Sequence, residues 1–178
     1  MNAPVEVKML RSIDLALPEI PNLPEPLKVR RAQISDAEKI ATLCGHGYIG
    51  EIWDKKSTEI ELFHDKTIKA VLLVTLKTRL VATASLQLHT DSEKTGQIRW
   101  VVTESDMRRQ GLAKSLVVRL LDISATEKCK ETYLKTTTDA TSAIALYLDL
   151  GFKPMVCSEK ERLVWTDVLK LLGVNPCF

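Results

Sequence analysis

Residues Ile98–Ala113 read IRWVVTESDMRRQGLA, and this stretch is the most informative part of the chain for the fold. The residues before Glu104 are mostly β-branched or aromatic, which predicts a strand over 97–103. Polar residues follow, and a helix is predicted to begin at Gly111. The first amides of a helix have no partner within the helix and carry the positive end of its dipole. This segment therefore predicts a binding site for an anion, and a diphosphate would suit it.

The residue types around this turn favour the same interpretation. Gly111 allows a ligand to approach the backbone closely, and Ala113 keeps the next turn small. Arg108 and Arg109 add positive charge. The segment is neither a G-x-x-x-x-G-K-[ST] phosphate loop nor a G-x-G-x-x-G dinucleotide motif. A helix start with two solvated arginines is the alternative that these residues alone leave open.

Two motifs resemble those of the GNAT superfamily of acyl-CoA-dependent N-acyltransferases. Arg108-x-x-Gly111-x-Ala113 fits the family's [R/Q]-x-x-G-x-[G/A], a pattern that is weak alone because many helices begin this way. Residues 143–152 (AIALYLDLGF) fit a second family motif, A-x-x-L-Y-x-x-x-G-F. The motifs occur in the family's order, and together they make a strong signal. The resemblance covers 28–152 by element order and 97–152 by motif.

The resemblance implies acetyl-CoA, or another short acyl-CoA, as the donor substrate. It implies that backbone groups of one strand segment pair with the pantetheine arm, namely Val101, Val102 and Thr103. It further implies that the pyrophosphate is held by the backbone amides of Arg108, Arg109, Gln110, Gly111, Leu112 and Ala113. No metal is implied.

The same resemblance implies the chemistry. An acceptor amine would attack the bound thioester directly, with backbone donors stabilising the developing oxyanion. Tyr147 would be the general acid that protonates the departing CoA thiolate. An unperturbed phenol, with a pKa near ~10, stays protonated at neutral pH and suits that role.

The chain also departs from the family pattern. Many members carry a glutamate base where this chain has Gln97, which cannot accept a proton. Members often have an asparagine where Ala140 stands. Thr138, Asp139 and Ser142 are the candidates to replace that contact with CoA. Glu104 lies close to the donor loop and is a candidate base, although a solvated loop carboxylate explains it too.

Other polar and aromatic residues fall where the family binds its acceptor. His46, Tyr48 and Trp53 lie in the region that shapes that site, although a core role explains Trp53 as well. His89 and Asp91 end the strand before the 90–94 loop, on the side where an acceptor would enter. Turn formation explains these two equally well.

The remaining patterns predict an α/β fold with a mixed sheet. The resemblance implies that this central sheet is largely antiparallel and flanked by helices. Strands are expected over 28–33, 70–76, 80–88, 97–103 and 132–136. Helices are expected after an N-cap at Ser35, around 51–66, and over 111–126, 142–150 and 159–172. The last replaces what is often a hairpin in the family. Five of seven prolines lie in residues 1–26, which predicts an N-terminal arm followed by an acyltransferase domain over 27–178.

Composition narrows the classes of function. The 178 residues carry 25 basic and 23 acidic side chains, a net charge of +2 that argues against nucleic-acid binding by phosphate neutralisation. We see no signal peptide and expect no membrane span. The four cysteines show no C-x-x-C spacing, so we expect reduced thiols, no zinc site and a cytoplasmic location.

The expected function is N-acetyl transfer from acetyl-CoA to an amine, with a small-molecule acceptor favoured over a protein N-terminus or lysine. Two other functions stay open. Gln97 would suit a catalytically weak acyl-CoA sensor, and an interaction module on the same fold would bind no CoA. A homodimer formed through sheet edges or the C-terminal region is also compatible with the resemblance.

Overall fold

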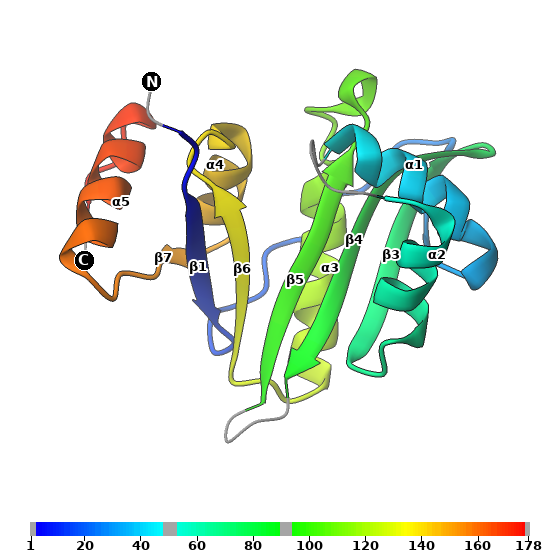
Figure 1. The fold of residues 1–178 in the computed structure, drawn as a ribbon, viewed down its shortest axis with the longest axis horizontal. Helices are drawn as coiled ribbons and strands as arrows, with labels where there is room; N and C mark the ends of the chain where they lie inside the picture. Colours follow the sequence, from blue (N-terminus) through cyan, green and yellow to red (C-terminus); the bar gives the residue numbers. More distant parts are fainter. Residues whose placement is uncertain (1–2, 48–52, 90–93, 177–178) are drawn as a thin grey trace.

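A computed structural model describes residues 3–47, 53–89 and 94–176. Seven strands form one sheet in the order β2-β3-β4-β5-β6-β1-β7, with helices on both faces (Figure 1). The strands are β1 (Glu6–Ser12), β2 (Leu27–Arg31), β3 (Ile68–Leu76), β4 (Arg79–His89), β5 (Thr95–Thr103), β6 (Glu131–Thr137) and β7 (Lys153–Pro154). The helices are α1 (Ala37–Gly47), α2 (Lys55–Glu59), α3 (Leu112–Thr126), α4 (Thr141–Asp149) and α5 (Glu159–Leu171).

Neighbouring strands run antiparallel except for β5 and β6, which are parallel. Two consecutive parallel strands need a crossover, and α3 supplies it. The predicted mixed, largely antiparallel sheet with an added C-terminal helix is therefore confirmed.

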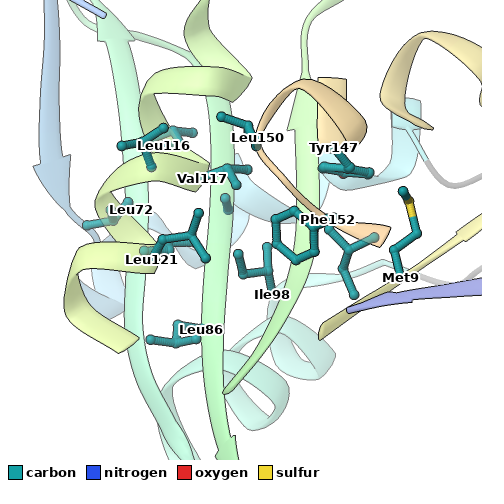
Figure 2. Close-up of a cluster of buried hydrophobic side chains, with 14 of the residues drawn as sticks. Met9, Leu72, Leu86, Ile98, Leu116, Val117, Leu121, Tyr147, Leu150 and Phe152 are labelled. Carbon is teal, nitrogen blue, oxygen red and sulfur yellow. The ribbon is translucent and has the colours of Figure 1, made fainter. Parts of the chain in front are cut away.

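Apolar side chains pack on both faces of the sheet. The main core joins the sheet to α3, α4 and α5, and Figure 2 shows part of it around Phe152 and Ile98. A second core lies on the other face, where Ile40 and Leu43 of α1 pack against Val71 and Leu73 of β3. The alternation along β3 follows from the period of two in a strand, and it explains why this buried strand reads as a continuous apolar run.

The first helical segment begins differently from our expectation. Ser35 is not an N-cap but lies inside a short 3-10 turn (Ile34–Asp36) that leads into α1. Asp36 organises this turn: its carboxylate accepts the Gln33 amide at 2.9 Å and both guanidinium nitrogens of Arg30 at 2.6 and 2.7 Å. The buried carboxylate does the capping that we had assigned to the serine hydroxyl.

The helix-prone stretch around 51–66 is also shorter than expected. It divides into α2 and a π-helical turn over Ile60–His64. Asp54 caps α2 by accepting the Ser57 amide at 2.7 Å. Residues 51 and 52 lie outside the described part of the chain.

The N-terminal segment differs most from the expectation. Strand β1 lies within the expected arm, yet it sits between β6 and β7 and pairs with β6 from Glu6↔Thr137 to Ser12↔Glu131. Its residues contain no proline, and Val7, Met9 and Arg11 alternate toward the core. The border expected at residue 26 is thus not a border of the sheet.

The segment after β1 is fastened by a buried arginine. The Arg11 guanidinium donates to the carbonyl oxygens of Leu150 at 2.8 Å, Ser12 and Leu15 at 3.1 Å, and Ala16 at 2.7 Å. Burial lowers the pKa of this guanidinium. These bonds tie the end of α4 to the segment that connects β1 to β2.

None of the described helices has both the length and the apolar character needed to cross a bilayer. No disulfide joins the three described cysteines, of which Cys44 and Cys129 are buried and Cys157 is exposed. Cys177 lies outside the described residues.

Candidate functional site

Strands β5 and β6 separate halfway along their length. Their parallel pairing runs from Thr95↔Glu131 to Ile98↔Leu134 and stops there, although both strands continue. Beyond this point β6 pairs with β1, and β5 pairs with β4 alone. Figure 1 shows the two strands diverging toward the loop that follows β5. We call this opening the fork. Within the described part of the chain, it leaves the backbone edge of Arg99–Thr103 without a strand partner on its β6 side.

A β-bulge lies at the fork. Ser85 pairs with Arg99 and Thr83 with Val102, so two residues of β5 oppose one of β4. Trp100 has a φ of 55°, in the left-handed region that costs a bulky residue about 1–3 kcal/mol. The Trp53 ring meets it edge-on at 4.4 Å between centroids. Such a bulge bends and twists its strand, which accounts for the parting of β5 from β6.

The loop beyond the fork leads to the N-terminus of α3. The Glu104 amide still bonds to the Val81 carbonyl at 2.9 Å, and buried Met107 anchors the following turn. Arg109 and Gly111 both have left-handed φ values, 62° and 77°. Gly111 is the N-cap of α3, at the helix start that we expected, and among the described residues no side chain caps the helix. The first amides of α3 therefore retain their capacity to bind an anion.

A cavity of about 320 Å³ adjoins this loop. It lies between the end of α1 and the end of β5, and its lining is Leu43, His46, Gly47, Val102, Thr103, Glu104, Ser105 and Arg108. Gly47 permits this close approach, because a Cβ there would lie 2.7 Å from a methyl group of Val102. The cavity thus brings the expected donor residues together with His46 from the expected acceptor region.

Glu104 lines the cavity, but other groups surround its carboxylate. His46 Nδ1 lies 3.6 Å from one oxygen, and the Arg79 guanidinium lies 3.9 Å from the other. Arg79 also bonds to Asp106 at 2.8 and 2.9 Å, and this contact holds the pKa of the Asp106 carboxyl below its usual value. An acceptor amine would compete with the Arg79 guanidinium and the His46 ring for Glu104.

Tyr147 lies in the main core. Only 6% of the residue is exposed, and its ring meets that of Phe152 edge-on at 5.9 Å (Figure 2). Burial raises the pKa of Tyr147 to about 12. Lys114 in the first turn of α3 bonds to Asp149 at the end of α4 at 2.7 Å, which joins the helix of Tyr147 to the donor loop.

Ser142 lies at the other end of α4, where it is exposed. It stands seven residues before Asp149, about 10 Å along the helix axis. No contact of Ser142 with the donor loop is seen among the described residues, so a role in CoA binding stays a prediction. Tyr48 and Asp91, the other two residues expected near the acceptor, lie outside the described part of the chain.

A second polar cluster sits at the base of the fork, and sequence reasoning missed its centre. Gln97 and Tyr133 are paired in register, one step before the strands part. Gln97 Oε1 accepts the Tyr133 hydroxyl at 3.0 Å and lies 3.2 Å from His89 Nε2. Tyr133 had not been singled out, because nothing in one sequence states which residues of two parallel strands are neighbours.

Comparisons with known proteins agree with this architecture. Residues 34–152 match the model of the acetyltransferase (GNAT) family. Human N-acetyltransferase 8 is 41% identical over 83 residues, which cover 47% of this chain and 36% of the human protein. The match thus spans about a third of that relative.

Solved structures share the fold at low identity. A GCN5-related N-acetyltransferase from Sphaerobacter thermophilus superposes with a TM-score of 0.67 at 18% identity, over 86% of this chain and 50% of that one. Glucosamine-6-phosphate N-acetyltransferase from Arabidopsis thaliana gives 0.54 at 18% identity, over 86% and 95%.

Proposed function

The chain belongs to the GNAT acetyltransferase family, and from this premise we propose that it transfers an acetyl group from acetyl-CoA to a small-molecule amine. The observation that carries the proposal is the fork, which opens directly beside an uncapped helix N-terminus with two arginines. Family membership implies acetyl-CoA as the donor. The acceptor and the residue roles below are our proposals.

The described residues fit that donor. The open edge of β5 offers the backbone groups of Val101, Val102 and Thr103 to the amide groups of a pantetheine arm, as an added strand would use them. Among the described residues, the buried Thr103 hydroxyl has no partner, which suits a site that a ligand completes. The amides and charges of Arg108–Ala113 would hold the pyrophosphate.

We propose that Tyr147 assists departure of the CoA thiolate. A pKa of about 12 keeps its hydroxyl protonated at every physiological pH. Complete proton transfer to a thiolate with an ordinary pKa near ~8.5 would be uphill by about 3–4 pH units, or about 5 kcal/mol. Tyr147 therefore acts mainly as a hydrogen-bond donor to the developing sulfur charge, which refines the general-acid role that the resemblance implies.

The cavity of about 320 Å³ serves both substrates in this proposal, because Val102, Thr103 and Arg108 line it from the donor side and His46 lines it from the acceptor side. We favour a small amine because a bound donor would fill part of this volume. Glu104 also lines the cavity and is a candidate base.

A panel of amines tests the proposal. The protein would be incubated with acetyl-CoA and, separately, with primary alkylamines, amino acids, an amino-sugar phosphate, and peptides with a free N-terminus or lysine. We expect amine-dependent release of free thiol, with one acetyl group added to the acceptor by mass spectrometry. Binding of acetyl-CoA without transfer to any of these amines would instead indicate an acyl-CoA-binding module.

A further inference from the structure

Three side chains from three strands meet at the base of the fork. His89 ends β4, Gln97 belongs to β5 and Tyr133 to β6. His89 Nε2 lies 3.2 Å from both Gln97 Oε1 and the Tyr133 hydroxyl, which itself donates to Gln97 Oε1 at 3.0 Å. The rings of His89 and Tyr133 stack at 5.9 Å between centroids. The imidazole is therefore held in one place and one orientation.

Gln97 also bears on which ring nitrogen carries the proton. We assign the proton of the neutral imidazole to Nε2, because Gln97 presents an amide oxygen there that can only accept a hydrogen bond, and the Tyr133 hydroxyl donates to that same oxygen. In a neutral imidazole the other nitrogen, Nδ1, then has a free lone pair and can accept a proton. Gln97 cannot take a proton, but it prepares a neighbour that can.

Charged side chains from other parts of the chain lie near the imidazole. Asp65 interacts electrostatically with His89 and Arg99, although its own pKa is lowered mainly by hydrogen bonds from Thr67. Across the fork, the Lys8 ammonium lies 4.0 Å from the centre of the Tyr133 ring. The cluster of His89, Gln97 and Tyr133 is thus surrounded by one carboxylate and two cationic side chains from outside β4. These are Asp65, Arg99 and Lys8.

The cluster is placed where a reacting group would arrive. Gln97 and Tyr133 form the last pair but one before β5 and β6 separate, so their side chains lie at the closed end of the fork. They and His89 project from the face opposite α3 and α4, because their neighbours Ile98, Leu134 and Leu88 all point into the main core. A donor in the fork would be approached by its acceptor from this face.

We propose that His89 is the catalytic base of the acetyl transfer and that Gln97 and Tyr133 position it. The inference rests on the proposed function. His89 Nδ1 takes one proton from the acceptor ammonium, directly or through one water molecule. The amine nitrogen then bonds to the thioester carbonyl carbon, the C–S bond breaks, and the thiolate leaves. The second proton lost by nitrogen passes to the thiolate, and imidazolium returns the first proton to solvent.

A matched set of variants separates His89 from Glu104. His89→Gln and Glu104→Gln are compared with His64→Gln, which makes the same substitution at an exposed histidine. The acceptor is the primary alkylamine that turns over fastest in the amine panel. We expect His89→Gln to lower kcat/KM at pH 7 by about 10²–10⁴-fold and to remove the acidic limb of its pH profile. His64→Gln should retain that limb. Loss of the limb in Glu104→Gln, with the limb kept in His89→Gln, would assign the base to Glu104 and overturn the proposal.

Two further measurements distinguish a base from a structural residue. An acceptor of low pKa is already unprotonated at pH 7, so the loss in His89→Gln should shrink with it. Added imidazole should restore turnover in His89→Gly. An unchanged pH profile in His89→Gln, or a loss that is the same for every amine, would overturn the proposal.

The tautomer can be measured without any turnover. ¹⁵N NMR of the full chain should show His89 protonated on Nε2 at neutral pH, and Gln97→Leu should alter that state. Protonation on Nδ1 instead would overturn the inference while leaving acetyl transfer intact. Conversely, failure of the whole amine panel would refute the proposed function, whatever the tautomer.

Discussion

The Tyr147 hydroxyl is buried rather than solvated, and this burial determines its protonation state during the proposed reaction. Its phenol is buried in the main core and its pKa is raised to about 12 by that burial. A group that stays protonated cannot limit activity by losing its proton below about pH 11. Whatever basic limb a rate profile shows below that pH must come from another group.

We therefore expect Tyr147→Phe to lower kcat by about 10–150-fold, the loss of one hydrogen bond to a charged atom at about 1.5–3 kcal/mol. The pH profile should keep its shape between pH 7 and 10, because the phenol does not titrate there. Binding of acetyl-CoA, measured by thermal shift, serves as the control and should change little. An unaltered kcat would refute the role of Tyr147.

Asp36 contributes to stability through its bonds to Arg30 and the Gln33 amide. The Arg30 contact is the main cause of its lowered pKa. A carboxyl whose pKa is lower in the folded state stabilises the fold fully above its unfolded value, near 3.8. This stabilisation is lost as the pH falls from there through the lowered folded value.

Accordingly, Asp36→Asn should cost about 2 kcal/mol at pH 7, discounted because Arg30 is half exposed, and should lower Tm by about 4–8 °C. The difference from wild type should disappear as the pH falls below 3.8. Asp167→Asn, at an exposed position of α5, is the matched control. An equal Tm for the two variants at pH 7 would contradict the assignment.

Among the elements, β1 was not predicted, because a proline-rich segment follows its strand pattern in the sequence. Because of the prolines at 18–26, we expected all of residues 1–26 to form an arm. Residues 6–12 contain no proline, and their side chains alternate between buried and more exposed positions, as in any half-buried strand. The paired residues of β6 lie 119 to 131 positions later, and no local signal specifies that pairing. In contrast, the turn into α3 could be predicted, because Gly111 and the start of the helix pattern are adjacent in the sequence.

The candidate site divides in the same way. Arg108–Ala113 could be predicted because a short contiguous motif carries the chemistry. The cluster of His89, Gln97 and Tyr133 could not, because it depends on the register of two parallel strands joined by α3. The pairing of Glu104 with His46 and Arg79 likewise joins three separate elements.

If β1 is an integral strand, Met9→Ala should destabilise the protein by about 2–5 kcal/mol, because Met9 is fully buried between the sheet and its covering helices. Leu17→Ala, at an exposed leucine of the following segment, should change stability by less than about 0.5 kcal/mol. Chemical denaturation measures both. Equal stability of the two variants would mean that residues 1–26 are a dispensable arm.

Considered as a whole, the molecule places two openings on one sheet. The fork and the N-terminus of α3 face the proposed donor, and the cluster around His89 faces the proposed acceptor. The cavity beside α1 is lined by residues from both sides. The bulge at Trp100 lies between them. The proposed reaction therefore occurs where the sheet is interrupted, and the paired strands on either side keep that interruption rigid.

The central claim is that the fork and the α3 N-terminus bind acetyl-CoA, and thermal unfolding tests it most directly. Acetyl-CoA at about 100 times its Kd should add about 2.7 kcal/mol, which raises Tm by about 5–10 °C for a chain of this size. Arg108→Glu should lose that shift, whereas Lys160→Glu, with the same charge change on α5, should keep it. No shift in the wild-type protein, or an equal shift in Arg108→Glu, would contradict the account.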